Sequence, residues 1–185
     1  MKIRLFAVLS VIAGSFALAS CIDEGATDEV IFNDDLAEIQ TYLDTTSIVN
    51  VKEFHDESRG ITVIWQELSA SKDTVVLGDT LKVNYTGRLL SNKAFDTSLE
   101  DIAKEEGIFS SQRKYVPLVF RIGIGQLIPG FEVAASQMEV GDKATVFIPS
   151  YYGYGKQGSS DGRIPANTPI MFELELLDVI PGPKQ

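Results

Sequence analysis

The sequence is poor in the two residue types that most often build metal centres and covalent cross-links. Its 185 residues include one cysteine and one histidine. A disulfide needs two thiols, and a protein zinc site draws most of its ligands from cysteine and histidine. An internal disulfide framework is therefore excluded, and no metal site is expected.

The single histidine is also a weak candidate for acid–base catalysis. His55 has Glu53, Asp56 and Glu57 close by in the sequence, and an exposed histidine beside carboxylates is usually a solvated residue. With no second histidine, a Ser-His-Asp arrangement has no other base to use. Hydrolases that depend on such a triad are therefore not expected.

Positive charge is scarce. The chain has 16 lysines and arginines against 26 aspartates and glutamates, which gives a formal net charge of -10. A surface of this sign repels the phosphate backbone of nucleic acids. We therefore expect no nucleic-acid partner.

A phosphate-binding glycine loop is missing as well. Gly153–Gly158 has the spacing G-x-G-x-x-G after a predicted strand, but Ser159–Pro165, which follows, cannot begin the helix that a dinucleotide fold requires. No Gly-Lys-Ser/Thr sequence occurs anywhere. Nucleotide binding is therefore not expected.

The apolar run at the start of the chain is short for a membrane span. Leu5–Ala19 is uncharged and follows two basic residues, whereas a spanning helix needs about 20 apolar residues. This layout predicts a signal peptide over residues 1–20. It closes on Leu-Ala-Ser-Cys, which resembles the bacterial lipobox and implies that Cys21 is lipidated and anchors the protein in a membrane.

A second interpretation of the same residues stays open. Ala17-Leu18-Ala19 also fits the A-x-A pattern of a cleavage site. Cleavage there would release the protein with a free thiol at Cys21.

Residues 21–60 are predicted to form an acidic tether. Leu36, Ile39 and Leu43 recur at helical spacing within it, and they predict a helix near residues 34–44. The remainder, residues 45–60, is interpreted as a linker.

From residue 61 onward the hydrophobic period changes to two. Leu81, Val83 and Tyr85 alternate with polar residues, as do three later segments around Phe120, Val146 and Phe172. A short helical pattern begins at Pro129 and lies between these segments. The sequence predicts an α+β domain over residues 61–180, with an antiparallel β-sheet wrapped around a short α-helix, followed by a tail over residues 181–185.

Aromatic residues are distributed over separate predicted elements and must converge in so small a domain. They are Tyr85, Phe95, Phe120, Phe131, Tyr154 and Phe172. We interpret Phe120 as core. Asp96 directly follows Phe95, and the tyrosines add polar tips to apolar walls, which indicates an open pocket rather than a filled core.

Seven blocks, in order and with near-standard spacing, resemble the FKBP-type peptidyl-prolyl cis-trans isomerases. The blocks are Val83–Gly87, Phe95–Asp96, Ile128–Glu132, Met138–Gly141, Tyr152–Gly155, Ile164–Pro165 and Phe172–Leu177. With the lipobox, the whole chain resembles the lipoprotein members of Bacteroidota, including those associated with gliding motility.

The resemblance assigns roles to particular residues. It implies that the catalytic residues are Tyr85, Phe95, Asp96 and Tyr154, and that the substrate-binding residues are Leu118, Leu127, Ile128, Phe131, Ile164 and Phe172. Three features depart from the usual pattern: Phe131 stands where many members have tryptophan, Leu118 replaces an aromatic side chain, and Ser159–Gly162 lacks the histidine frequent in the family. A further departure is the long segment 97–116, for which helical spacing predicts a small helix near the pocket mouth.

The resemblance implies a peptidyl-prolyl cis-trans isomerase (EC 5.2.1.8) that acts on Pro-containing segments of exported proteins, without a metal or cofactor. It also implies lipid anchoring in the cell envelope, in the outer membrane, and weak macrolide binding. The alternative is a tethered chaperone or assembly factor that holds such segments without turning them over. A lipocalin-like carrier would need a barrel made of strands alone, which the predicted helix after Pro129 opposes.

Overall fold

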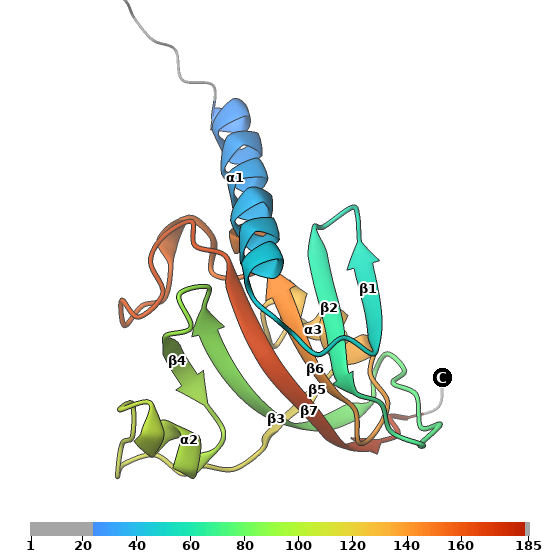
Figure 1. Ribbon diagram of the computed structural model, residues 1–185. Coiled ribbons are helices and arrows are strands. Elements are labelled where there is room, and N and C mark those ends of the chain that lie inside the picture. The colour runs from blue at the N-terminus through green and yellow to red at the C-terminus, as the bar shows by residue number, and fades with distance from the viewer. Residues whose placement is uncertain (1–23, 184–185) are drawn as a thin grey trace, which may run out of the picture.

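A computed structural model describes residues 24–183 (Figure 1), and the predicted signal peptide and the predicted lipidation site at Cys21 lie outside them. Seven antiparallel strands form one sheet in the order β1-β2-β6-β7-β3-β4, with β5 also paired to β3. The strands are β1 (Lys52–Asp56), β2 (Ile61–Glu67), β3 (Thr80–Leu89), β4 (Ala94–Thr97), β5 (Leu118–Arg121), β6 (Lys143–Ile148) and β7 (Ile170–Ile180). The predicted α+β class with a wrapped antiparallel sheet is confirmed.

The short helix α3 (Pro129–Ser136) packs against one face of the sheet. Proline occupies the first helical turn, where its missing N–H costs no hydrogen bond. Phe131, Ala134 and Ala135 are buried in the main hydrophobic core. Gly130 permits the close contact, because a Cβ there would lie 2.3 Å from Cγ2 of Ile148.

A second helix, α1 (Glu24–Thr45), packs with its C-terminal part on the opposite face of the sheet, while its N-terminal part extends beyond the strands (Figure 1). Ile39 packs there with Ile64, Phe147 and Met171, all of them buried. Successive strand residues point to opposite faces, so Phe147 contacts α1 while its neighbour Ile148 contacts α3. The sheet therefore has two cores.

The N-terminal region is more structured than the sequence indicated. The helix expected near 34–44 begins ten residues earlier, at Glu24, in a stretch without an apolar periodicity. The segment 45–60, interpreted as a linker, contains β1, which pairs with β2 from Lys52 to Asp56. Most β1 side chains are exposed, and backbone pairing rather than alternating burial defines this strand.

The long segment 97–116 contains the predicted small helix, α2 (Glu100–Glu105), of which Ala103 is fully buried. Across residues 24–183, none of the helices combines the length and the apolar character that a membrane crossing demands.

Candidate functional site

Six aromatic rings from distant parts of the chain form one connected cluster, which Phe120 joins through Phe131 at a centroid distance of 5.8 Å. Phe172 of β7 lies at its centre, with ring centroids 5.2 Å from Phe131 of α3, 5.5 Å from Phe95 of β4 and 6.1 Å from Tyr85 of β3. Tyr154 completes the cluster, 6.3 Å from Phe95. All these pairs are edge-to-face, the arrangement that ring quadrupoles favour. Phe95 and Tyr154 are the members of this cluster that line the cavity of the candidate site.

A glycine makes the approach of two of these rings possible. A Cβ at Gly87 would lie 2.4 Å from Cε2 of Phe95 and 2.7 Å from Cε1 of Phe172. Real Cβ atoms do not approach other atoms so closely, so any side chain at this position would push the rings apart. Gly87 belongs to the Val83–Gly87 block on which the family resemblance partly rests.

Asp96 sits at the polar edge of the cluster and is held by two side-chain donors, besides its own neighbour Thr97, whose backbone N–H donates to Oδ1 at 3.0 Å. The Tyr85 hydroxyl donates to Oδ2 of Asp96 at 2.6 Å, and the Arg113 guanidinium forms an ion pair with Oδ1. Arg113 also donates to the Tyr85 hydroxyl at 3.0 Å. Burial, followed by the hydrogen bond to Asp96, raises the pKa of Tyr85 well above its ordinary value, so this phenol stays protonated and remains a donor.

Arg113 is the one residue of this network that sequence reasoning missed. It comes from the loop after α2, in the segment 97–116, and its partner Asp96 lies 17 residues earlier. A single arginine in a segment longer than the usual family pattern carries no periodicity or spacing that points to Asp96. The available signal was the block Phe95–Asp96, because a carboxylate placed directly beside an apolar ring needs a cation nearby.

Tyr154 lies between two short 3-10 helices, η1 (Ser150–Tyr152) and η2 (Gly155–Gln157), in the loop that follows β6. The residue is 36% exposed. Burial raises the pKa of the hydroxyl, and the charges of Asp96 and Asp161 add to this effect. Tyr154 is thus a neutral donor at the rim of the ring cluster.

The loop after Tyr154 folds back and closes one side of the site. Ser159 N donates to the Ile164 carbonyl at 2.9 Å, and Arg163 donates to the Phe95 carbonyl at 3.0 Å. A cavity of about 460 Å³ opens between this loop and the rings. It is lined by Phe95, Asp96, Arg113, Tyr154, Gly158, Ser159, Ser160, Asp161, Arg163 and Ile164.

Of the predicted site residues among residues 24–183, Phe95, Asp96, Tyr154 and Ile164 line this cavity, and the other six do not. Phe95, Phe131, Ile164 and Phe172 are buried in the main core, and Tyr85, Leu118, Leu127 and Ile128 are partly buried against it. Asp96 and Tyr154 line the same cavity. His55 lies elsewhere, on β1, where it pairs with Glu53 at 2.5 Å on the surface.

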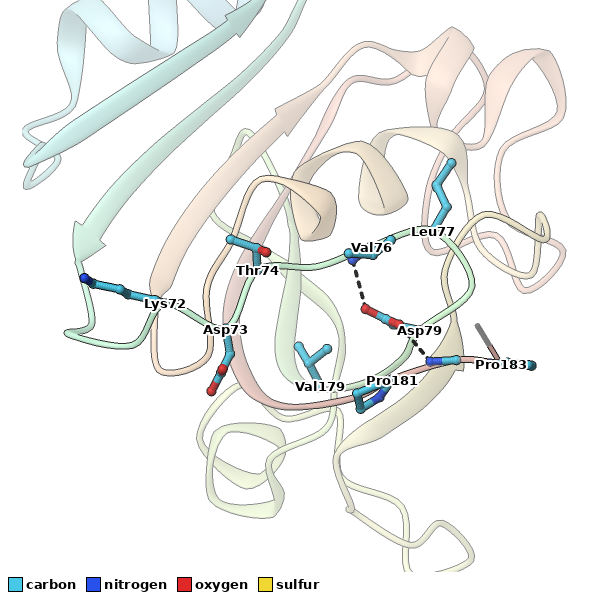
Figure 2. A pocket seen from close by; sticks show the side chains of 10 residues that line it. Lys72, Asp73, Thr74, Val76, Leu77, Asp79, Val179, Pro181 and Pro183 are labelled. Atoms are coloured by element: carbon cyan, nitrogen blue, oxygen red, sulfur yellow. Dashed lines mark hydrogen bonds between the residues drawn. The ribbon is translucent and has the colours of Figure 1, made fainter. Parts of the chain in front are cut away.

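A larger cavity, about 720 Å³, lies at the other end of β3 and β7 (Figure 2). Asp79 lies at its side and accepts hydrogen bonds from Val76 N at 2.9 Å and Gly182 N at 2.8 Å, which the dashed lines mark. Both oxygens of this buried carboxylate are therefore used to fix the chain. The side chains of the candidate site, Asp96, Arg113 and Tyr154, line the smaller cavity beside the ring cluster instead.

Comparison with known proteins identifies relatives of the segment that carries the cluster. The family model for FKBP-type peptidyl-prolyl cis-trans isomerases matches residues 71–177. FK506-binding protein 2 of Dictyostelium discoideum is 37% identical over 102 residues, which cover 55% of this chain and 66% of that protein. FK506-binding protein 1 of Eremothecium gossypii is also 37% identical over 102 residues, 55% of this chain and 77% of that protein.

An archaeal relative is more similar over a shorter stretch. The short-type peptidyl-prolyl cis-trans isomerase of Methanocaldococcus jannaschii is 47% identical over 78 residues, 42% of this chain and 49% of that protein. The chain thus spans from about half to two thirds of the length of the Methanocaldococcus and Dictyostelium relatives.

Proposed function

The chain belongs to the FKBP-type peptidyl-prolyl cis-trans isomerase family, and on this premise we propose that it catalyses rotation about X-Pro peptide bonds by non-covalent binding. The observation that carries the proposal is the convergence of an apolar ring cluster with Asp96 and Tyr154 at one cavity. The proposed substrates are Pro-containing segments of exported proteins.

The barrier that such an enzyme lowers is electronic. Rotation about a peptide bond crosses roughly 18–20 kcal/mol because it destroys amide resonance, and uncatalysed X-Pro exchange takes tens to hundreds of seconds. The planar amide is more charge-separated than the twisted one. An apolar pocket therefore disfavours the planar ground state more than the twisted transition state.

The side chains of this site fit that task. Phe95 lines the cavity and would supply an apolar wall for a proline ring, with Phe172 packed against Phe95 and Phe131 packed against Phe172. The charge of Asp96 is balanced within the site by Arg113. Tyr154, neutral and at the rim, would donate to the carbonyl before the proline, and a bond that strengthens as the amide twists favours the transition state.

The test is isomerisation of an X-Pro peptide by the chain lacking residues 1–21, with Phe95→Ala and Asp96→Ala as variants. We expect acceleration by the parent chain and a loss of about tenfold or more in each variant, which corresponds to about 1.4 kcal/mol of transition-state stabilisation. Tyr151→Phe, on the exposed neighbour of the rim, is the matched control and should keep full activity. Acceleration that both Phe95→Ala and Asp96→Ala leave untouched would refute the assignment.

We also propose that the protein is a lipoprotein of the cell envelope, held in the outer membrane as in the Bacteroidota forms that it resembles. The support is the sequence: an uncharged run at Leu5–Ala19 that ends in a lipobox at Cys21. Incorporation of labelled palmitate that is lost in Cys21→Ser is the expected result. Equal labelling of both, or of neither, contradicts the anchor.

Weak binding of a macrolide such as FK506 is a further proposal. The ring cluster supplies the apolar surface, while Phe131 and Leu118 present smaller walls than the usual tryptophan and aromatic residue. Titration with FK506 should show weaker binding than that of Phe131→Trp. Equal or weaker binding by this variant would contradict the role given to Phe131.

A further inference from the structure

Helix α1 presents one continuous face to the parts of the molecule that carry the site. Asp28, Phe32, Asp35, Ile39 and Tyr42 are spaced three or four residues apart, which places them on one side of a helix. Ile39 anchors this face to the sheet, as described above. The polar members of the face contact two loops that end at the ring cluster.

The first loop is the one that carries Tyr154. Asp35, only 3% exposed, accepts two hydrogen bonds on Oδ2, from Ser150 N at 2.7 Å and from Ser150 Oγ at 2.6 Å. Ser150 is the first residue of η1, where the chain leaves the sheet. Beyond Tyr154, Lys156 forms an ion pair with Asp28 at 2.7 Å. Helix α1 therefore holds the loop on both sides of Tyr154.

The second loop leads to Phe95 and Asp96. Asn92 lies in the turn between β3 and β4, in the left-handed conformation with φ of 65°. The Tyr42 hydroxyl donates to its Oδ1 at 2.7 Å, and the Tyr42 ring rests on Phe147 of the sheet at 5.6 Å. The same helix thus contacts the turn directly before β4, the strand that carries Phe95 and Asp96.

We propose that α1 is a positioning element that fixes the loop bearing Tyr154 relative to the strand bearing Phe95 and Asp96, with Asp35 as its main positioning residue. The proposal rests on the isomerase function proposed above. It gives the N-terminal helix a role in the reaction, although no α1 residue lines the cavity.

The physical reason lies in how the Tyr154 loop is built. It consists of two 3-10 helices of three residues each, and so short a helix supplies little rigidity of its own. Catalysis needs the Tyr154 hydroxyl at a fixed distance from the substrate carbonyl, and a misplacement of about 1 Å lowers rates by as much as a hundredfold. Buried hydrogen bonds to a helix anchored on the sheet supply the missing constraint.

The test compares three variants of the full chain. Asp35→Ala removes the acceptor, and we expect kcat/KM for an X-Pro peptide to fall about tenfold, mainly through kcat, while the far-ultraviolet circular dichroism stays native. Asp35→Asn keeps an acceptor oxygen for both Ser150 donors and should restore activity to within about twofold of wild type. Asp34→Ala removes an exposed carboxylate from the next position and should change nothing.

A second readout does not depend on activity. In the chain labelled with 3-fluorotyrosine, the fluorine resonance of Tyr154 should shift or broaden in Asp35→Ala and return in Asp35→Asn. If Asp35→Ala does not fold, Asp28→Asn breaks the exposed ion pair alone, and the same resonance should move with about a twofold loss of kcat/KM.

The outcomes separate the two proposals. A wild-type chain that does not accelerate exchange refutes the isomerase function, and a Tyr154 resonance that still moves in Asp35→Ala then supports α1 as a positioning element. An active wild type whose kcat/KM and Tyr154 resonance are unchanged in Asp35→Ala overturns the positioning role. An activity loss that Asp35→Asn does not restore overturns the hydrogen bonds to Ser150 as its cause.

Discussion

At the scale of single residues, the site depends on residues that leave space for its rings or fix its carboxylate, as much as on the side chains that would touch a substrate. Gly87 lets Phe95 and Phe172 meet, because no other residue leaves room for both rings. The Tyr85 hydroxyl and the Arg113 guanidinium fix the Asp96 carboxylate. Each of these contacts can be removed with a single substitution.

Gly87→Ala should loosen the ring cluster. Its Cβ would meet Phe95 at 2.4 Å, and overpacking of this kind destabilises a core by about 1–3 kcal/mol. Urea denaturation should show that loss, and the isomerisation rate should fall with it. A variant with unchanged stability and rate would show that neither depends on the contact between Phe95 and Phe172.

The buried carboxylate of Asp35 makes stability depend on pH. Burial raises its pKa above 3.8 although Ser150 lowers it, and the nearby charge of Asp34 adds to the rise. The folded state therefore holds this proton to a higher pH than the unfolded state, so the free energy of unfolding decreases as pH rises through the raised pKa.

Asp35→Asn should remove this component. The free energy of unfolding of the variant relative to wild type should increase from about pH 4 to pH 7, measured by urea denaturation at several pH values. The pKa of Glu38 is raised by burial and further by the charge of Asp35, so Asp35→Asn also removes part of that rise, which changes the difference in the same direction. A difference that decreases with pH would contradict the raised pKa.

At the scale of elements, the site is completed by two segments that lie outside the seven blocks shared with the family. The segment 97–116 brings Arg113 to Asp96, and α1 holds the loop of Tyr154. The small helix of the first segment was predicted from the sequence by the spacing of Leu99, Ile102 and Ala103. Its contribution to the site was not, because contacts between distant residues leave no local pattern.

Arg113→Gln should lower activity far more than stability. Its side chain is 38% exposed and that of Asp96 34%, and solvent-exposed pairs contribute only about 0.2–1 kcal/mol to folding. Loss of the guanidinium frees Asp96 to move in the site, so kcat/KM should fall about tenfold. Lys114→Gln, the same charge change one residue later, is the matched control. An equal loss of kcat/KM in the two variants would show that Arg113 acts through net charge alone and not through its contact with Asp96.

At the scale of the whole molecule, sequence reasoning was most successful where burial follows a simple period. Alternation in β3, β6 and β7 predicted the sheet, and the run after Pro129 predicted α3. Strand β1 was missed because both its faces are largely exposed. The junction of Asp35 with Ser150 joins residues 115 positions apart, and no spacing could have revealed it.

The two cores of the sheet should unfold together. Ile39 is 4% exposed beneath α1, and isoleucine-to-alanine changes in a core destabilise by about 2–5 kcal/mol. Ile39→Ala should therefore lower the urea midpoint of a single transition, followed by both tryptophan fluorescence and circular dichroism. An unchanged urea midpoint would show that the packing of α1 on the sheet does not stabilise the fold, as expected of a loosely attached acidic tether.

The central claim is that the ring-lined cavity speeds the interconversion of the two isomers and does not merely hold them. Exchange spectroscopy by nuclear magnetic resonance on an X-Pro peptide, with catalytic amounts of the chain, measures that interconversion directly. The account predicts cross-peaks between the cis and trans resonances that appear with the wild-type chain and disappear with Phe95→Ala. Peptide resonances that shift on binding while the exchange rate stays at its uncatalysed value would contradict it and identify a chaperone-like binding module.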